Sequence, residues 1–256
     1  MSAPPTPPTQ PKTATPALVA ELDALDAQLD RRFRVIETRV PAPASLGAAA
    51  PREFLLRHPA SAEELIVEEA FDRDERLPYW ADLWPAAVAL SAHAVPLAEA
   101  YHVRRPGARA LELGCGVGLV TTVLALSGFD VLATDYYDDA LNFARLNAGR
   151  NAGAAIGTRN VDWRDFPTDL GRFDLIVASD VLYERPYASL VAHAIHRSLK
   201  AKGLAIVADP GRVAADAFVG ECRARGLNVD WGDRVPFEDG QIRQSITLYE
   251  ITRPHD

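Results

Sequence analysis

The chain has 256 residues, of which 48% are hydrophobic and 24% are charged, a composition typical of folded globular proteins rather than disordered ones. Its 27 basic and 35 acidic residues give a net charge of −8, which disfavours binding to the phosphate backbone of a nucleic acid. Two cysteines exclude a disulfide scaffold, and the lack of a long apolar stretch or an N-terminal signal segment predicts a cytoplasmic protein with no membrane partner.

The beginning of the chain is rich in proline, which accounts for six of the first sixteen residues. Because proline has no amide donor and this segment has few apolar groups to bury, we expect residues 1–16 to be a disordered tail. Residues 17–76 are expected to form an extension that packs on the following domain. Leucines recur every three or four residues over 17–32, which predicts a helix. The other elements expected here are strands at 33–40 and 54–56, a loop at 41–52 and a short helix at 60–64.

Residues 77–256 show a different pattern, in which helix-like and strand-like segments alternate. Helices are expected at 85–100, 118–127, 138–151, 186–199 and 214–225. Strands are expected at 109–113, 130–134, 155–161, 174–178, 204–208, 228–231 and 242–251. Such alternation predicts an α/β fold with a mostly parallel seven-stranded sheet and helices on both faces. Because a short glycine-containing loop joins the last two strands, we expect the last strand to be antiparallel to its neighbours.

A glycine-rich turn joins the first strand of this domain to the helix that follows. The turn reads Glu-Leu-Gly-Cys-Gly-Val-Gly over residues 112–118. Alternate glycines permit a tight turn and let a ligand approach the backbone, while the helix that begins there presents free N–H groups. Asp135 ends the second strand, where doubly wound nucleotide-binding folds hold a ribose. Together the two features predict a nucleotide-type site.

The glycine spacing departs from the dinucleotide fingerprint, in which a third glycine follows the second after two other residues. Leu119 stands at that position, and no second nucleotide-binding half follows the fourth strand. The carboxylate of Glu112 would repel a pyrophosphate. It suits a cationic ligand, such as an ammonium or a sulfonium.

These motifs resemble those of class I, seven-β-strand S-adenosylmethionine (SAM) methyltransferases. The matching segments are 112–118, Asp135, Asp162-Trp163 and the run Ser-Asp-Val-Leu-Tyr at 179–183. Upstream, Pro-Tyr-Trp-Ala-Asp-Leu-Trp-Pro at 78–85 is similar to the protein-lysine methyltransferase group once labelled nicotinamide N-methyltransferase-like. Within that group, the chain looks most similar to the enzymes that methylate the electron-transfer flavoprotein β subunit. The resemblance covers about residues 77–252 and implies a Rossmann-like methyltransferase domain at 77–256.

The resemblance also implies where SAM would contact this chain. The expected cofactor-binding residues are Trp80, Glu112, Gly114, Cys115, Gly116, Asp135, Tyr136, Asp162, Trp163 and Ser179. The two glycines and the backbone near Cys115 would pack against the methionine half, with Glu112 supporting its ammonium. Asp135 would bind both ribose hydroxyls. Tyr136 and Trp163 would lie beside the adenine, whose amino group would donate to Asp162.

Two further residues, Asp180 and Tyr183, are the expected catalytic ones. The resemblance implies direct in-line transfer of a methyl group from SAM to a lysine side chain of a protein, with S-adenosylhomocysteine as the product. Asp180, beside Ser179 at the end of the fourth strand, would orient the amine, and Tyr183 and Trp80 would wall the channel. Because a carboxylate raises the pKa of a neighbouring amine, we do not expect Asp180 to act as a general base.

Some alternatives stay open at this stage. The acceptor is a protein lysine or a small-molecule amine, and a SAM-binding protein without catalysis is a third possibility. A nucleic-acid acceptor is disfavoured because residues 180–183 lack the prolines that amino-methylating nucleic-acid enzymes carry there. The acidic run at 63–75 is either a solvated face or a rim that attracts a basic substrate. His193 and His196 are interpreted as surface or packing residues, so no metal is expected, and a monomer is favoured.

Overall fold

The computed structural model describes residues 14–48, 50–65, 77–240 and 242–254. Most of the proline-rich tail and most of the acidic run therefore lie outside the described residues. In the described part of the chain, no helix combines the length and the apolar character needed to cross a membrane.

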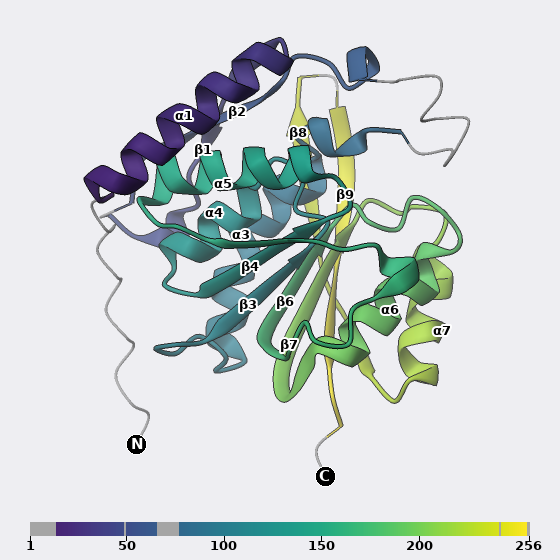
Figure 1. Ribbon diagram of the computed structural model, residues 1–256. Coiled ribbons are helices and arrows are strands. Elements are labelled where there is room, and N and C mark those ends of the chain that lie inside the picture. The colour runs from purple at the N-terminus through teal and green to yellow at the C-terminus, as the bar shows by residue number, and fades with distance from the viewer. Residues whose placement is uncertain (1–13, 49, 66–76, 241, 255–256) are drawn as a thin grey trace.

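A seven-stranded sheet forms the centre of the molecule (Figure 1). Its strands, in spatial order, are β5 (Gly157–Asn160), β4 (Asp130–Asp135), β3 (Arg109–Leu113), β6 (Phe173–Ser179), β7 (Leu199–Asp209), β9 (Ile242–Thr252) and β8 (Asn228–Asp239). The pairs from β5 to β7 are parallel, whereas β9 is antiparallel to both of its neighbours. The predicted α/β fold, with its mostly parallel sheet and antiparallel last strand, is confirmed.

Helices cover both faces of this sheet. They are α3 (Pro85–Ala100), α4 (Leu119–Leu126), α5 (Asp138–Ala152), α6 (Tyr187–Ser198) and α7 (Ala215–Ala224). The side chains of α6 and α7 share one hydrophobic cluster with β6 and β7, and those of α3 and α4 share another with the opposite face. The helices therefore form an outer layer on each side, as the alternation of helices and strands predicts.

The strand β8 is longer than the sequence pattern predicts, since it continues from the expected end at 231 to Asp239. Its second half contains glycine, proline and several charged residues, which are poor strand formers in isolation. Pairing with β9 continues through this half after an irregularity between Trp231 and Arg234. The pairing partner, which local propensity does not reveal, decides the length of this strand.

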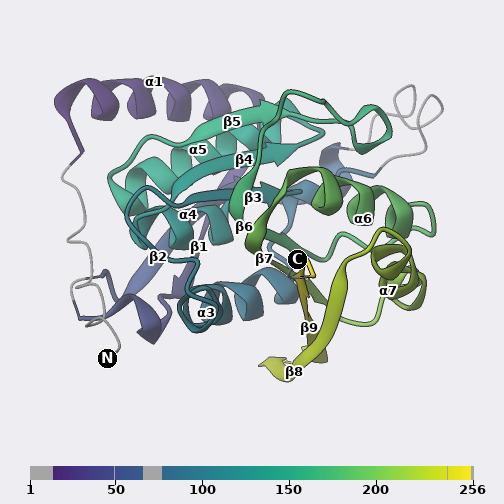
Figure 2. The same ribbon diagram turned by 90° about the horizontal axis from the view of Figure 1, so that it is seen from below.

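The N-terminal extension consists of the helix α1 (Pro16–Arg32) and an antiparallel hairpin of β1 (Val35–Pro41) and β2 (Glu53–Pro59). Short 3₁₀ turns η1 (Ala44–Leu46) and η2 (Glu63–Leu65) follow β1 and β2 respectively. The Thr15 hydroxyl caps α1 by accepting from the Leu18 N–H. Figure 2 shows α1 lying along α5, outside the β4–β5 side of the sheet.

Side chains of α5 bind the hairpin directly. The amide of Asn147 accepts from the Arg57 N–H (2.8 Å) and donates to the Arg57 carbonyl (2.9 Å), while Asn151 makes the same pair of bonds to Leu55. These amides occupy backbone groups of β2 that a further strand would otherwise satisfy. The extension is therefore held against the helix that follows β4, next to the carboxyl ends of the central strands.

Candidate active site

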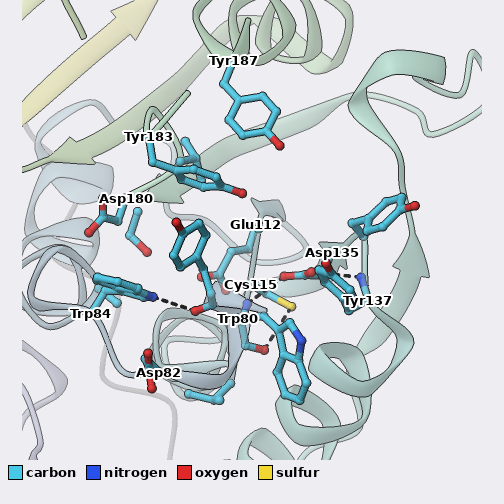
Figure 3. A pocket seen from close by; sticks show the side chains of 18 of the residues that line it. Trp80, Asp82, Trp84, Glu112, Cys115, Asp135, Tyr137, Asp180, Tyr183 and Tyr187 are labelled. Carbon is cyan, nitrogen blue, oxygen red and sulfur yellow. Dashed lines mark hydrogen bonds between the residues drawn. The ribbon is translucent and has the colours of Figure 1, made fainter. Parts of the chain in front are cut away.

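A pocket of about 1010 Å³, counting the part that is open to solvent, lies at the carboxyl ends of β3, β4 and β6. Figure 3 shows Asp180, Trp84 and Tyr183 at one end, and Trp80, Asp135 and Tyr137 at the other. Parallel α/β sheets place ligands at this edge because loops and helix N-termini converge there.

The turn between β3 and α4 forms the floor of the pocket, and its glycines have positive φ angles. A Cβ atom on Gly116 would lie 3.2 Å from the Trp80 carbonyl oxygen, and one on Gly118 would lie 2.6 Å from the Cα of Ala144. The backbone therefore packs closely on α5 and on the 3₁₀ turn η3 (Tyr79–Ala81). The lack of side chains creates a cradle that is open toward the pocket.

Asp135 ends β4 beside this cradle and is 7% exposed. One carboxylate oxygen accepts from the Gly116 N–H (3.0 Å) and the other from the Tyr137 N–H (3.1 Å). Burial raises the pKa of Asp135 to about 6, although these backbone hydrogen bonds oppose the shift. The Tyr136 N–H also bonds to this carboxylate, which has about four lone-pair positions, so the carboxylate still has the capacity to accept from a ligand hydroxyl.

Glu112 is almost fully buried beneath the same turn and accepts a hydrogen bond from the Thr121 hydroxyl. Burial raises its pKa to about 8, with a smaller contribution from the charge of Asp135. The side chain therefore carries a proton at neutral pH when no cation is near. A cationic ligand would favour the ionised form. Burial also raises the pKa of the adjacent Cys115 thiol, which argues against a nucleophilic role.

Trp80 closes the pocket on the side of the extension and is 8% exposed. Its ring packs on Phe143 of α5 (centroids 5.8 Å apart) and on Tyr137 (6.3 Å), and it meets Phe33 edge to face (6.2 Å). These contacts join η3, α5 and the segment after α1. The cover of the pocket is thus held by the N-terminal extension as well as by the main domain.

Another part of the pocket contains Tyr136, Asp162 and Trp163. Asp162 caps the 3₁₀ turn η4 (Trp163–Asp165) and forms an ion pair with Arg164 (2.7 Å). The Arg164 guanidinium also lies over the Tyr136 ring, 6.0 Å from its centroid. An added Cβ on Gly114 would lie 3.6 Å from the Trp163 ring, which shows how closely this indole approaches the glycine turn.

At the opposite end, Asp180 follows β6 with a φ of 56°, which is unusual for a residue other than glycine. Its N–H donates to the Ala208 carbonyl (2.9 Å). Arg212 donates from Nε to one oxygen of its carboxylate (2.6 Å) and from a terminal nitrogen to the other (2.9 Å). The backbone strain and the bidentate pair fix this carboxylate at the edge of the pocket.

Aromatic rings surround this end of the pocket. The Tyr183 ring meets Tyr79 (5.0 Å) and Tyr187 (4.9 Å) edge to face, and Trp84 meets Tyr79 in the same way (6.0 Å). We call Tyr79, Trp84, Tyr183 and Tyr187 the aromatic wall. Burial, followed by the proximity of Tyr187, raises the pKa of the Tyr183 hydroxyl, so this phenol stays neutral. Ring faces and neutral hydroxyls are suited to an amine or an alkylammonium.

All twelve residues that the sequence analysis names for the site line this one pocket. Five residues at or beside the site were not predicted from the sequence as site residues: Tyr79, Trp84, Arg164, Tyr187 and Arg212. Tyr79 and Trp84 belong to the segment 78–85 that carries the family resemblance, and Tyr187 lies four residues after Tyr183, so signals were present. Arg212 comes from the loop after β7, and nothing in its surrounding sequence points to Asp180.

His193 and His196 lie on α6, and burial lowers the pKa of both, followed by the charge of nearby arginines. Among the described residues, no group of three or more histidine, cysteine, aspartate or glutamate side chains is placed to hold a metal ion.

The chain is similar in sequence to known methyltransferases. A family model described as lysine methyltransferase matches residues 70–219. The electron transfer flavoprotein beta subunit lysine methyltransferase of Xenopus laevis is 29% identical over 194 residues, covering 66% of this chain and 74% of that protein. The protein of the same name in Rattus norvegicus is 31% identical and is covered over about half of its length (51%). A ubiquinone biosynthesis O-methyltransferase of Azotobacter vinelandii is 32% identical over 40% of this chain and 44% of its own.

Solved structures share the fold at low sequence identity. A TehB-like SAM-dependent methyltransferase from Corynebacterium glutamicum superposes with a TM-score of 0.50 at 23% identity, covering 68% of this chain and 89% of that one. A SAM-dependent methyltransferase from Clostridium acetobutylicum gives a TM-score of 0.54 at 14% identity, with 73% and 97% coverage. These likenesses establish a Rossmann-like methyltransferase fold.

Proposed function

This chain belongs to the lysine methyltransferase family, and from that premise we propose that it methylates a lysine side chain presented by another protein at the aromatic wall. Membership makes the protein a SAM-dependent enzyme. The residues that hold SAM and the acceptor, the identity of the acceptor and the product S-adenosylhomocysteine are parts of the proposal. A cytoplasmic location also belongs to it, since cysteines such as the two buried, unpaired ones here stay reduced in that compartment.

The residues of the pocket fit SAM. The glycine cradle accommodates a ligand at backbone distance. Glu112 is buried, burial raises its pKa, and no lysine, arginine or histidine among the described residues forms an ion pair with it. An α-ammonium would supply that charge. Asp135 retains acceptor capacity for ribose hydroxyls, and Trp163 and Tyr136 offer rings beside an adenine. The donor set is therefore suited to each part of the cofactor.

When bound, SAM would supply a methyl group on a positively charged sulfur. The lone pair of a neutral amine would form the new bond to that methyl carbon while the carbon–sulfur bond breaks, so that the sulfur leaves as a thioether and the positive charge passes to the methylated nitrogen. The protein contributes binding and orientation rather than a nucleophile of its own. We assign to Asp180 the hydrogen bond that aims the amine, because its carboxylate is rigidly held at the pocket edge. Tyr183 and the other rings of the aromatic wall would enclose the side chain and exclude water, which favours the neutral amine.

One observation supports this proposal most directly. A single pocket contains the glycine cradle, with Glu112 and Asp135, at one end, and Asp180 with the aromatic wall at the other. The first end fits a cationic cofactor and the second fits an amine. A lysine side chain is long and apolar up to its amine, so it can cross a ring-lined opening from a protein surface.

The electron-transfer flavoprotein β subunit is the first acceptor to test, because two relatives of this chain are named for methylating it. The experiment incubates the purified enzyme with methyl-labelled SAM and the purified flavoprotein from the same organism, followed by mass spectrometry of lysines. An extract of that organism serves as a second source of acceptors, separated into protein and small molecules. Asp180→Asn is the matched variant, since it removes the charge and nearly preserves the size of the side chain.

We expect label on a lysine of a protein, with SAM binding retained and transfer lost in Asp180→Asn. Label on another protein would leave lysine methylation in place and change the acceptor. Label only in the small-molecule fraction would contradict the protein-acceptor proposal and indicate a metabolite amine. SAM binding without transfer to any acceptor would indicate a binding protein.

A further inference from the structure

Arg212 has an environment that a surface ion pair lacks. Its guanidinium donates to both oxygens of Asp180 and lies over the Trp84 ring, 5.3 Å from its centroid. Its backbone is fixed as well, because one oxygen of Asp209 accepts from the Arg212 N–H (2.8 Å) and the Gly211 N–H (2.7 Å). The Asp180 side chain is only 3% exposed. The conformation of the loop after β7 therefore holds the Arg212 guanidinium against the Asp180 carboxylate.

The need for a cation follows from the chemistry of the acceptor. An alkylamine has a pKa near 10.4 and attacks a methyl group only in its neutral form. An isolated carboxylate within hydrogen-bonding distance would stabilise the ammonium and hold back the reaction. A carboxylate that is paired with a guanidinium still has free lone pairs for an N–H donor, but the charge of the pair is close to zero.

We propose that Arg212 is a positioning residue that fixes the Asp180 carboxylate and neutralises it, so that Asp180 aims the acceptor amine without retaining the amine in its protonated form. This inference rests on the proposed function, because it concerns the amine-binding end of the same pocket. Arg212 acts through Asp180 and is not itself assigned a contact with the amine.

Other charged and titratable groups lie around this end of the pocket. They are Asp209 after β7, Glu184 after β6, Tyr183 and Tyr187 of the aromatic wall, and Tyr79 and Asp82 near η3. Glu112 and Asp135 lie farther away, at the cofactor end of the same pocket. Burial, opposed by the backbone hydrogen bonds of Gly211 and Arg212, raises the pKa of Asp209. Burial also raises the pKa of Asp82. In the described part of the chain, the cation that hydrogen-bonds Asp180 is Arg212.

Sinefungin offers a test that needs no knowledge of the acceptor. This SAM analogue carries an amine-bearing carbon in place of the methylated sulfur, whereas S-adenosylhomocysteine has neither the amine nor a charge at that point. The ratio of their dissociation constants, measured calorimetrically at pH 7, therefore reports how favourably the acceptor end receives an ammonium. Four variants are compared with the wild type: Arg212→Gln, Asp180→Asn, the double variant of these two, and Arg212→Lys. Arg159→Gln, which removes the exposed pair with Asp169, is the control.

Removal of one unit charge about 6 Å from an amine, at an effective dielectric constant of about 20, changes relative affinity by up to about a hundredfold. Because the Arg212 side chain is 33% exposed and solvent screens its charge, a change of about tenfold is expected here. We expect the preference for sinefungin to rise about tenfold in Arg212→Gln and to fall about tenfold in Asp180→Asn. In the double variant both charges are gone, so the preference should return to within about threefold of the wild-type value. Arg212→Lys keeps the charge and should resemble the wild type in this ratio.

The rate of methyl transfer to the protein lysine provides the second readout. In Arg212→Gln we expect the rising limb of kcat against pH to move upward by about one pH unit, since the amine is harder to deprotonate. In Arg212→Lys, the rise of kcat with pH should occur at the same pH as in the wild type. The value of kcat should fall about tenfold, because a lysine ammonium does not form the two parallel hydrogen bonds that the guanidinium donates to the Asp180 carboxylate. A purely structural role would lower the rate equally at every pH.

An unchanged sinefungin preference in Arg212→Gln would overturn the inference, whatever the acceptor is. Superimposable pH profiles of Arg212→Gln and the wild type, after scaling, would overturn it as well. A wild-type enzyme that transfers no methyl group to any lysine would instead contradict the proposed function. In that case the sinefungin ratios still decide whether Arg212 balances the charge of Asp180.

Discussion

The indole N–H of Trp84 donates to the backbone carbonyl of Tyr79 over 2.8 Å, and the two rings meet edge to face. This bond closes the short turn between η3 and α3. It places the ring that supports Arg212 and a ring of the aromatic wall in one rigid segment with Trp80, the cover of the cradle. The two ends of the pocket are therefore connected through the chain segment that precedes α3.

Replacing Trp84 by phenylalanine tests this connection. Trp84→Phe keeps an aromatic ring and removes the hydrogen bond to Tyr79, so we expect about 1 kcal/mol of lost stability. The KM for the acceptor should rise severalfold while the affinity for SAM changes little. Urea denaturation and steady-state kinetics measure both. Trp231→Phe is the matched control, because Trp231 is 56% exposed on β8. An equal effect in the control would contradict the special role of Trp84.

The glycine cradle makes a second prediction. Gly116→Ala places a Cβ atom 3.2 Å from the Trp80 carbonyl oxygen at a positive φ, so the turn and its cover must move apart. We expect the affinity for SAM to fall at least tenfold. Gly226 also has a positive φ, but an added Cβ there meets nothing within 4 Å. Gly226→Ala should therefore cost about 1 kcal/mol of stability and leave SAM binding unchanged. Calorimetry on both variants distinguishes loss of the cradle from backbone strain alone.

The pKa of Glu112 predicts a pH dependence of stability. In the folded protein burial raises it to about 8, above the ordinary value of 4.5. The folded protein therefore binds more protons than the unfolded chain in this interval, and the free energy of unfolding falls as the pH rises through it. Above about pH 8 this contribution levels off. In Glu112→Gln, the free energy of unfolding should depend less on pH between pH 6 and 8 than it does in the wild type. Urea denaturation at each pH measures this difference.

The same group predicts proton release when SAM binds. The ammonium of the cofactor favours ionised Glu112, so the affinity for SAM should rise with pH up to about 8. Calorimetry at pH 7 in two buffers with different ionisation enthalpies counts the protons released. Glu112→Gln should bind SAM more weakly and release fewer protons. A wild-type enzyme that releases none at pH 7 would contradict the assignment of Glu112 to the ammonium.

A further prediction concerns the attachment of the N-terminal extension. The Asn147 amide also donates to the Val117 carbonyl (2.8 Å), so it joins β2 to the glycine turn. Asn147→Ala leaves these buried backbone groups without a partner and should cost about 3 kcal/mol of stability. Asn142→Ala on the same helix is the control and should have a small effect. Equal losses in urea denaturation would show that the amide bridge contributes little.

Much of this architecture is encoded locally. The helix α3 begins and ends at the predicted residues, because a proline opens it and an apolar pattern continues to Ala100. The strand β3 also has its predicted bounds, since a buried parallel strand appears as an apolar run that ends at glycines. The chain order of strands and helices then fixes where Gly114, Asp135 and Asp180 meet, because parallel strands end at one edge of the sheet.

Tertiary structure decided what local patterns do not contain. The second half of β8 is a strand because β9 pairs with it, despite its unfavourable residues. Tyr187 joins the wall because the direction of α6 turns its ring toward Tyr183. Asp180 and Arg212 are 32 positions apart in the sequence, and the local sequence around either residue does not predict that they form an ion pair. Periodicity and glycine placement in the sequence predicted the fold, the glycine turn and Asp135 at the sheet edge, whereas Asp180 and Tyr183 were predicted from the family resemblance. Long-range packing decided that Arg212 pairs with Asp180 and that the rings of the aromatic wall enclose the opening of the pocket, because the contacts join segments far apart in the chain.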